Sequence, residues 1–471
     1  MTSQAHKPNI VFFFTDDQRF DTIRALGNEE IVTPNLDRLV NMGTTYTHAH
    51  IPCGTSGAVC MPSRAMLHTG RSLFHLEGEG QRIPANHITL GETLQKAGYR
   101  TFGTGKWHNG PEGYARSFTD GAEIFFGGMW DHWNVPACNY DPTGRYEDAI
   151  PWIRNPFQDN KVQKLRADHI RLGVHSTELF SEASIDFIEA YDDASPFFMY
   201  LAFMAPHDPR SMPERFRRMY DPDKLTLPAN FAPEHAFDFG GRDIRDEILA
   251  PYPRTPEIVR EHLAEYYGMI SHLDHEIGRV IAALKKKGEF ENTIFVFAGD
   301  NGLAVGQHGL FGKQNCYEHS IRVQLIFAGT GIPSGERRGA YAYLFDIYPT
   351  LCDLLEIDVP ASVDGKSLRP NIVNAGVSHR DDLFFAYTNR VRSVKDARYK
   401  LIEYVYENAI TTQLFDLAED PIEMENLADR PECEQKIAAL RDRLSEYSKA
   451  WDEREHRLGK SFWDQYEAAS A

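Results

Sequence analysis

Hydrophobic positions along the chain form runs of strand length that alternate with segments of helical periodicity. The strand candidates are nearly continuous in apolar residues, as expected for strands buried on both faces of a sheet, and they lie at 9–14, 100–104, 196–204, 293–297 and 323–328. The helix candidates lie at 34–42, 88–97, 181–191 and about 256–287. This alternation predicts an α/β fold.

The pattern changes after about residue 375. Short segments with the character of antiparallel strands lie at 383–387, 400–406 and 413–416, and a closing helix follows over about 432–451. We therefore expect two domains: a large one over residues 1–375, and a smaller α+β domain over residues 376–471 that packs against it.

Charge and hydropathy exclude some classes of function. The net charge is −18, from 50 Lys and Arg against 68 Asp and Glu, which argues against binding to nucleic acid or to an anionic membrane surface. No apolar run approaches the roughly 20 residues that span a bilayer. Residues 1–8 are polar and show no features of a secretory signal. The chain as given is therefore expected to be cytoplasmic, or periplasmic or secreted where an export signal has been removed.

The cysteines show neither a zinc-type spacing nor a CxxC pair. They are scattered along the chain, at Cys53, Cys60, Cys138, Cys316, Cys352 and Cys433. A disulfide framework is not expected in a protein of this size, and reduced thiols fit a cytoplasmic setting.

Reactive side chains follow four of the five predicted strands. Asp16 and Asp17 follow the first strand; the residues that follow the next three are Lys106 and His108, then His207, then Asp300 and Asn301. A helix-capping aspartate explains any one of these endings but not the set of four. Because active sites of open α/β sheets gather outside the carboxyl ends of the strands, we expect these side chains to meet.

The oxygen-bearing members of this set predict a divalent metal site. Asp16, Asp17, Asp300 and Asn301 supply three carboxylates and an amide oxygen, a hard set that suits Ca²⁺ or Mg²⁺ rather than zinc. Adjacent carboxylates repel each other unless a cation or proton intervenes. We expect Ca²⁺, which tolerates looser and higher coordination, with Mg²⁺ as the alternative.

Cys60 opens the segment Cys-Met-Pro-Ser-Arg-Ala-Met-Leu-His-Thr-Gly-Arg. Pro62 suits the first turn of a helix, which places Cys60 at a helix N-terminus, where exposed amides favour an anion. Arg64 lies one turn further along. For the three residues Cys-x-Pro alone, a structural cysteine beside a helix cap would be the better explanation.

The whole segment resembles the type I sulfatase signature C-x-P-S-R with T-G-R four residues later. The resemblance extends over nearly the whole chain, through G-K-W-H, P-H-x-P, D-N-G…H-G…K and the late L-F-D-L stretch, with small departures at Asn109 and Gln324. It implies an alkaline phosphatase-like fold: a large mixed, mostly parallel sheet flanked by helices, followed by a smaller C-terminal domain. It also implies a sulfuric ester hydrolase that acts on a sulfated carbohydrate, in which a maturation enzyme converts Cys60 to formylglycine.

Carried over position by position, the resemblance assigns roles to the site residues. Formylglycine at position 60 would be a further metal ligand beside Asp16, Asp17, Asp300 and Asn301. The aldehyde hydrate would be held by Arg64, Lys106 and His108, the sulfate would be bound by His207 and Lys313, and the pocket would be completed by His308. As a hypothesis, one hydroxyl of the hydrate attacks sulfur, His207 protonates the leaving group, and His108 is the base for release of sulfate.

Several alternatives stay open on the sequence. The same scaffold could serve a phosphonate monoester or phosphodiester hydrolase, an aryl or alkyl sulfatase, or a binding protein whose Cys60 is never matured. His68 is expected in the core, and His75 could be a substrate contact. A group of aromatic residues could stack on a sugar ring, pack in the core or form a lid; it comprises Phe125, Phe126, Trp130, His132 and Trp133.

Overall fold

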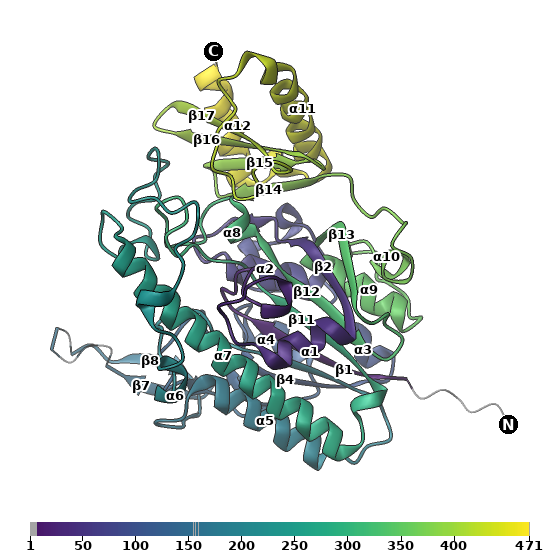
Figure 1. Cartoon of the computed structure of the whole chain (residues 1–471). Coiled ribbons are helices and arrows are strands. Elements are labelled where there is room, and N and C mark those ends of the chain that lie inside the picture. Colours follow the sequence, from purple (N-terminus) through teal and green to yellow (C-terminus); the bar gives the residue numbers. More distant parts are fainter. Residues whose placement is uncertain (1–6, 154, 156, 159, 471) are drawn as a thin grey trace.

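An eight-stranded sheet is the largest element of the computed structural model, which describes residues 7–153, 155, 157–158 and 160–470 (Figure 1). Its strands run in the order β13 (Glu336–Tyr343), β2 (Gly43–His50), β12 (Arg322–Gly329), β11 (Thr293–Gly299), β1 (Asn9–Thr15), β10 (Phe197–Ala202), β4 (Arg100–Lys106) and β5 (Asp120–Phe125). β12 is antiparallel to both neighbours, and the other pairs are parallel. The expected mixed, mostly parallel sheet is confirmed.

The interior of the central strand β1, from Ile10 to Phe14, is entirely apolar because it is buried on both faces. Ile10, Phe12 and Phe14 belong to one buried hydrophobic cluster, while Val11 and Phe13 belong to another. Because successive side chains of a strand point to opposite faces, the two clusters lie on the two faces of the sheet. Polar side chains of β1 therefore occur only at its two ends, at Asn9 and Thr15.

Helices cover both faces of the sheet. One face packs against α1 (Pro34–Met42), α5 (Ser176–Ala190) and α7 (Pro256–Lys287), and the other against α2 (Cys60–Thr69), α3 (Leu90–Lys96) and α9 (Ile347–Leu354). The shorter helices are α4 (Pro111–Ser117), α6 (Glu214–Arg217), α8 (Glu318–Ile321) and α10 (Arg369–Val373). Two small antiparallel pairs are formed by β6 (Pro136–Ala137) with β9 (His169–Ile170) and by β7 (Ala149–Trp152) with β8 (Gln163–Arg166). Among the described residues, no helix combines the length and apolar character needed to cross a membrane.

All five predicted strands of the large sheet and all four predicted helices are present, with ends that shift by up to five residues. The prediction missed β2, β5 and β13. β2 lies between β12 and β13, but its sequence is Gly-Thr-Thr-Tyr-Thr-His-Ala-His and contains no apolar run that would predict a strand. Its threonines and Tyr46 suit a strand by β-propensity, a weaker signal than a continuous apolar run.

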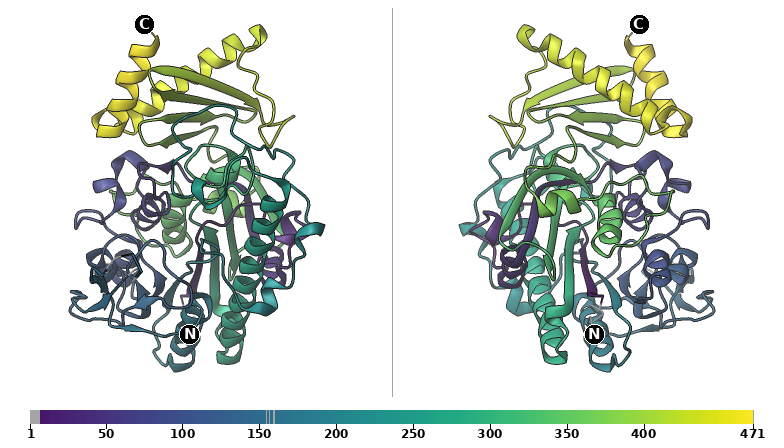
Figure 2. Two further views of the ribbon diagram at one scale, coloured as in Figure 1. Left: turned by 90° about the vertical axis from the view of Figure 1, so that its left-hand side faces the viewer. Right: turned by 90° about the vertical axis from the view of Figure 1, so that its right-hand side faces the viewer.

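A second, five-stranded sheet lies at the C-terminal end of the chain, at the top of Figure 1 and of both views in Figure 2. Its order is β17 (Ala409–Asp416), β16 (Tyr399–Tyr406), β15 (Val391–Lys395), β14 (Leu383–Tyr387) and β3 (Cys53–Gly54). It packs against α11 (Glu434–Ala450) and α12 (Arg457–Ser470). The expected short strands and closing helix are present, but β3 comes from near the start of the chain. The division at residues 375 and 376 stays a prediction.

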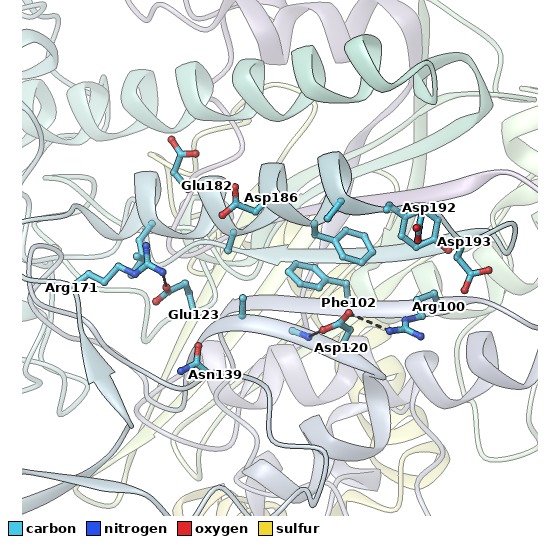
Figure 3. A pocket seen from close by; sticks show the side chains of 17 residues that line it. Arg100, Phe102, Asp120, Glu123, Asn139, Arg171, Glu182, Asp186, Asp192 and Asp193 are labelled. Carbon is cyan, nitrogen blue, oxygen red and sulfur yellow. Dashed lines mark hydrogen bonds and ion pairs between the residues drawn. The ribbon is translucent and has the colours of Figure 1, made fainter.

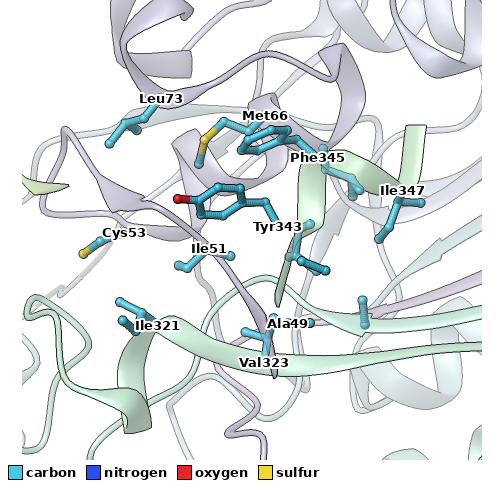
Figure 4. Close-up of a cluster of buried hydrophobic side chains, with 14 of the residues drawn as sticks. Ala49, Ile51, Cys53, Met66, Leu73, Ile321, Val323, Tyr343, Phe345 and Ile347 are labelled. Atoms are coloured by element: carbon cyan, nitrogen blue, oxygen red, sulfur yellow. The ribbon is translucent and has the colours of Figure 1, made fainter. Parts of the chain in front are cut away.

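A buried cluster fixes helix α2 against the large sheet (Figure 4). Met66 of α2 lies among aromatic and aliphatic side chains, including Tyr343 at the end of β13 and Phe345 just beyond it. Ala49 of β2 and Val323 of β12 belong to the same cluster. This packing fixes the start of α2, where Cys60 lies, relative to the strands.

A buried network of charged groups joins the two sheets. The carboxylate of Glu318, in α8, accepts hydrogen bonds from Lys395 of β15 at 2.9 Å and from Lys400 of β16 at 3.1 Å. Lys400 also donates to Glu423, and Lys395 contacts His50 at the end of β2. All five side chains are buried. Burial lowers the pKa of Lys395 to about 8, even though Glu318 favours its charged form.

The network predicts a large stability cost for Glu318→Gln. Removing this charge leaves two buried lysines with less compensation, and breaking a buried pair typically costs about 3–5 kcal/mol in the free energy of unfolding. Chemical denaturation monitored by fluorescence measures the change. The control is Glu214→Gln, whose pairs with Arg217 and Arg218 are exposed to solvent and should contribute little to stability. Equal losses for the two variants would contradict the prediction.

Candidate active site

The carboxyl ends of four neighbouring strands form the floor of the site. β11, β1, β10 and β4 are adjacent in the sheet and parallel, so the residues that follow them emerge at one edge. Asp16 follows β1, Asp300 follows β11, Lys106 ends β4, and His207 lies five residues beyond β10. Gly105 precedes the lysine with a φ of 89°, and a Cβ there would lie 1.9 Å from the carbonyl oxygen of Ala202. Only glycine fits this approach of β4 to β10.

Asp16, Asp17, Asp300 and Asn301, which we call the oxygen cluster, are fully or almost fully buried. The Asp17 N–H donates to Oδ1 of Asp300 at 3.1 Å, and Nδ2 of Asn301 donates to Oδ1 of Asp17 at 2.7 Å. Asp17 adopts a left-handed φ of 61°, a conformation that aspartate tolerates better than most residues.

Three buried cations, which we call the cation set, surround the oxygen cluster: Arg64, Lys106 and Lys313. Nε of Arg64 donates to Oδ2 of Asp300 at 2.8 Å, and Lys106 forms an ion pair with Asp16. Lys313 pairs with Asp17. Burial opposes ionisation of Asp16, but Lys106, His207 and Arg64 together hold its pKa well below the usual range.

Cys60 is the first residue of α2, as expected, and its side chain points into this cluster of charges. Its Sγ lies 3.5 Å from Nζ of Lys106 and 3.5 Å from Nδ1 of His108. The sulfur and carboxylate oxygens of Asp16 and Asp300 all lie within 4.8 Å of one another. Burial raises the pKa of the Cys60 thiol, although Lys106 opposes that shift. The thiol is therefore held protonated among oxygen atoms.

The start of α2 is tied directly to the end of β11. Oγ of Ser63 donates to the backbone carbonyl of Asp300 at 2.5 Å, and Nη1 of Arg64 donates to the carbonyl of Lys106 at 3.1 Å. The helix ends at Gly70, whose φ of 65° allows its N–H to bond to the carbonyl of Met66. These bonds hold position 60 beside the strand ends.

The oxygen cluster fits a hard divalent cation. Oδ1 of Asp16 and Oδ1 of Asn301 are buried and have no hydrogen-bond partner among the described residues. Buried oxygens are normally paired, so these two are available as ligands. Burial and the neighbouring Asp16 charge also raise the pKa of Asp300 to about 7, a sign that the negative charges are incompletely compensated. Carboxylate and amide oxygens are the ligands that Ca²⁺ and Mg²⁺ prefer.

His207 and His308 have different places in the structure. Nε2 of His207 lies 3.6 Å from a carboxylate oxygen of Asp17, within the site. The ring of His308 instead stacks on Tyr317 with centroids 4.1 Å apart, and its Nε2 lies 3.1 Å from Nδ2 of Asn230. The structure therefore brings together every predicted site residue except His308. His308 instead lines a separate cavity of about 360 Å³ next to β17.

His132 has a role that the sequence did not reveal. Its ring is fully buried, its Nε2 lies 2.9 Å from the backbone carbonyl of His207, and its Nδ1 lies 2.7 Å from Oγ of Ser176. It therefore supports the loop that carries His207. Tyr266 of α7 was also missed: its hydroxyl donates to the backbone carbonyl of Asp17 at 2.5 Å. No short-range pattern marks either contact, because the partners are distant in sequence.

Four of the other aromatic and histidine candidates have their partners outside the oxygen cluster. Phe126 contacts Tyr146, and Trp130 contacts Trp152. His68 is buried between Trp107 and Tyr200, as expected for a core residue. His75 pairs with Asp364 and Asp452.

A surface pocket of about 390 Å³ lies between α5 and the edge strand β5 (Figure 3). Phe102 and Phe187 stack at its floor with centroids 4.3 Å apart, and acidic side chains such as Glu182 and Asp186 line its rim. None of its lining residues belongs to the oxygen cluster or the cation set.

Comparison with known proteins identifies the family of the chain. The family described as Sulfatase matches residues 8–357, and the one described as N-sulphoglucosamine sulphohydrolase, C-terminal matches residues 306–450. An arylsulfatase of Clostridium perfringens is 30% identical and covers 92% of this chain and 93% of its own length. An N-acetylglucosamine-6-O-sulfatase of Bacteroides thetaiotaomicron is 26% identical over 97% of this chain and 90% of its own.

Solved structures show the same fold. A protein solved in complex with its substrate D-glucosamine-2-N,6-O-disulfate superposes with a TM-score of 0.77 at 23% identity, covering 96% of this chain and 99% of that one. A phosphonate monoester hydrolase of Agrobacterium radiobacter has a TM-score of 0.72 at 21% identity, covering 94% and 96%. With the match over residues 8–357 and a 30% identical relative along almost the full length, the chain belongs to the sulfatase family, in the alkaline phosphatase-like superfamily.

Proposed function

We propose that this sulfatase removes sulfate from a sulfated carbohydrate, using a formylglycine formed from Cys60 and a Ca²⁺ ion held by the oxygen cluster. The observation that carries the proposal is the position of the Cys60 sulfur, beside Asp16 and Asp300 and in contact with Lys106 and His108. The carbohydrate is inferred from relatives: the N-acetylglucosamine-6-O-sulfatase, and a 28% identical ulvan-active sulfatase of Formosa agariphila.

Two chemical arguments support the conversion of the Cys60 thiol to formylglycine. The cluster consists of hard oxygen ligands, and a neutral thiol is a poor match for a hard cation such as Ca²⁺. The nucleophile of a cysteine is its thiolate, which burial disfavours at position 60. An aldehyde hydrate at the same position would instead present oxygen atoms to the metal and to the substrate.

The burial of Cys60 favours conversion before folding is complete. Only 2% of the residue is exposed, and α2 is packed against the large sheet. A maturation enzyme therefore needs the segment around Cys60 in an extended, unfolded form. This makes the unfolded chain, rather than the finished protein, the partner of that enzyme.

The remaining groups divide the chemistry between charge and proton transfer. A bound divalent ion would supply charge stabilisation, and the formylglycine hydrate would supply the oxygen nucleophile for sulfur, with Asp300 accepting the proton of that hydroxyl. Lys313 binds the sulfate with His207, and the cation set as a whole compensates the sulfate charge in a buried site. His207 protonates the departing ester oxygen as the S–O bond breaks, and His108, next to position 60, accepts a proton when sulfate leaves.

Mass spectrometry and a Cys60→Ser variant test the nucleophile. In protein produced with its maturation enzyme, we expect the peptide that contains position 60 to lose about 18 Da, the difference between thiol and aldehyde. Cys60→Ser should lose steady-state turnover by more than about 10³-fold, because a serine sulfate ester has no second hydroxyl to expel sulfate. The control is Cys433→Ser, a cysteine outside the site at the start of α11. Full multiple turnover by Cys60→Ser would rule out the proposed nucleophile.

Chelation tests the metal. Dialysis against a strong chelator should lower kcat by more than about 10²-fold, because the oxygen cluster then lacks the charge that stabilises the transition state. Added Ca²⁺ should restore activity at a lower concentration than Mg²⁺. Activity that survives complete removal of divalent ions, verified by elemental analysis, would contradict the assignment.

A substrate panel tests the reaction and the substrate class. We expect kcat/KM for N-acetylglucosamine 6-sulfate to exceed that for choline sulfate and for phenyl phosphonate monoesters by more than about tenfold, because a sugar site gains hydrogen bonds that those esters lack. A preference for the phosphonate would support a phosphonate hydrolase on this scaffold. A preference for 4-nitrophenyl sulfate over all sulfated sugars would support an arylsulfatase.

A further inference from the structure

A second group of ligating side chains lies between α5 and α7, away from the oxygen cluster. The two helices pack side by side (Figure 1). Glu178 lies in the first turn of α5, while His272 and Glu276 lie one turn apart on α7. One ligand atom from each of the three lies within 4.8 Å of the others. Two helices thus direct an imidazole and two carboxylates to one point.

His272 is the unusual member of the group. Its side chain is almost completely buried, and neither ring nitrogen has a hydrogen-bond partner among the described residues. Its Nε2 lies 3.5 Å from Oε1 of Glu178, longer than an ordinary N–H···O bond. Phe216 and His175 pack against the ring at centroid distances of 4.6 and 4.8 Å. A buried polar group without a hydrogen-bond partner costs free energy, so a ligand for either ring nitrogen of His272 would be stabilising.

The charges around His272 favour a cation. Oε2 of Glu276 accepts a hydrogen bond from Arg279 at 2.7 Å, while Oε1 has no hydrogen bond among the described residues and lies 3.9 Å from Nε2 of His275. Arg279 also pairs with Glu182, an acid at the rim of the pocket in Figure 3. The surroundings of His272 contain three carboxylates and two arginines: Glu178, Glu182 and Glu276 against Arg279 and the exposed Arg215, which stacks on Phe216. One negative charge remains in excess.

We infer that Glu178, His272 and Glu276 form a second metal site, which takes Zn²⁺ or another divalent ion of similar softness. A mixed set of imidazole nitrogen and carboxylate oxygens suits these ions better than Ca²⁺. Ligand atoms around Zn²⁺ lie about 3.4 Å apart, so small side-chain rotations close the present separations. The side chain of Glu178 is 33% exposed and gives the ion a route from solvent.

An ion at this site would link the two long helices that cover one face of the sheet. α7 also carries Tyr266, which supports the backbone of Asp17, and the ring of His272 begins a column of contacts that leads through His175 to His132. His132 in turn contacts the carbonyl of His207. The ion would therefore stabilise the scaffold behind the active site without contacting the substrate.

Metal titration of the Ca²⁺-loaded full chain tests the inference. Calorimetric titration should show one more equivalent of Zn²⁺ bound by the wild type than by His272→Ala. Co²⁺ should give visible d–d absorption in the wild type that the variant lacks. At about one hundred times the Zn²⁺ dissociation constant, the wild-type Tm should rise by about 3 °C and the variant Tm should not.

Two further variants make the test decisive. His275→Ala removes a 45% exposed histidine on the same helix, whose Nε2 lies 3.9 Å from Glu276, and should keep the extra equivalent. Glu178→Gln, at a partly exposed position, should lose the extra equivalent of Zn²⁺. This variant replaces His272→Ala in the comparison if His272→Ala fails to fold. The inference is overturned if Glu178→Gln or a folded His272→Ala binds as much Zn²⁺ as the wild type, or if the wild type gives no d–d absorption.

Discussion

Three carboxylates and an amide are buried side by side at the ends of β1 and β11, and the rest of the active site depends on compensating their charge. Like charges at this separation cannot all ionise in a buried setting without cations nearby. The chain supplies cations from three separate places: Arg64 from α2, Lys106 from the end of β4, and Lys313 from the loop after β11. This compensation is possible because the sheet places β4, β10, β1 and β11 next to one another.

Much of this arrangement could be predicted from the sequence, because a strand buried on both faces admits few polar residues. The end of such a strand is therefore visible as an abrupt change from apolar to charged residues, as at Asp16 and Asp300. β2 was missed because its buried residues include the polar side chains of Thr44, Thr45 and His50, so that it makes no apolar run. The long helix α7 was predicted with both ends correct, since Pro256 and Gly288 mark them.

The positions of side chains in loops were harder to predict, because loops lack the regular periodicity that shows which way each side chain of a helix or strand points. His308 precedes Gly309 and adopts a left-handed φ of 53°, and its ring stacks on Tyr317 instead of facing the oxygen cluster. His132 was grouped with its aromatic neighbours in sequence, yet it contacts His207, 75 positions later. Such contacts depend on the packing of α5 and of the loop after β10. Neither can be inferred from local pattern.

The short strand β3 links the position of Cys60 to the timing of synthesis. Cys53 and Gly54 pair with Ala386 and Tyr387 of β14, so the segment just before α2 has its final partner only when the second sheet has been made. Roughly 330 residues separate Cys60 from that partner, and at about 5–20 residues per second a ribosome needs about 16 to 65 s to add them. During that interval the segment just before α2 lacks its pairing with β14. For the function proposed above, this interval is the period in which a maturation enzyme would have access to Cys60.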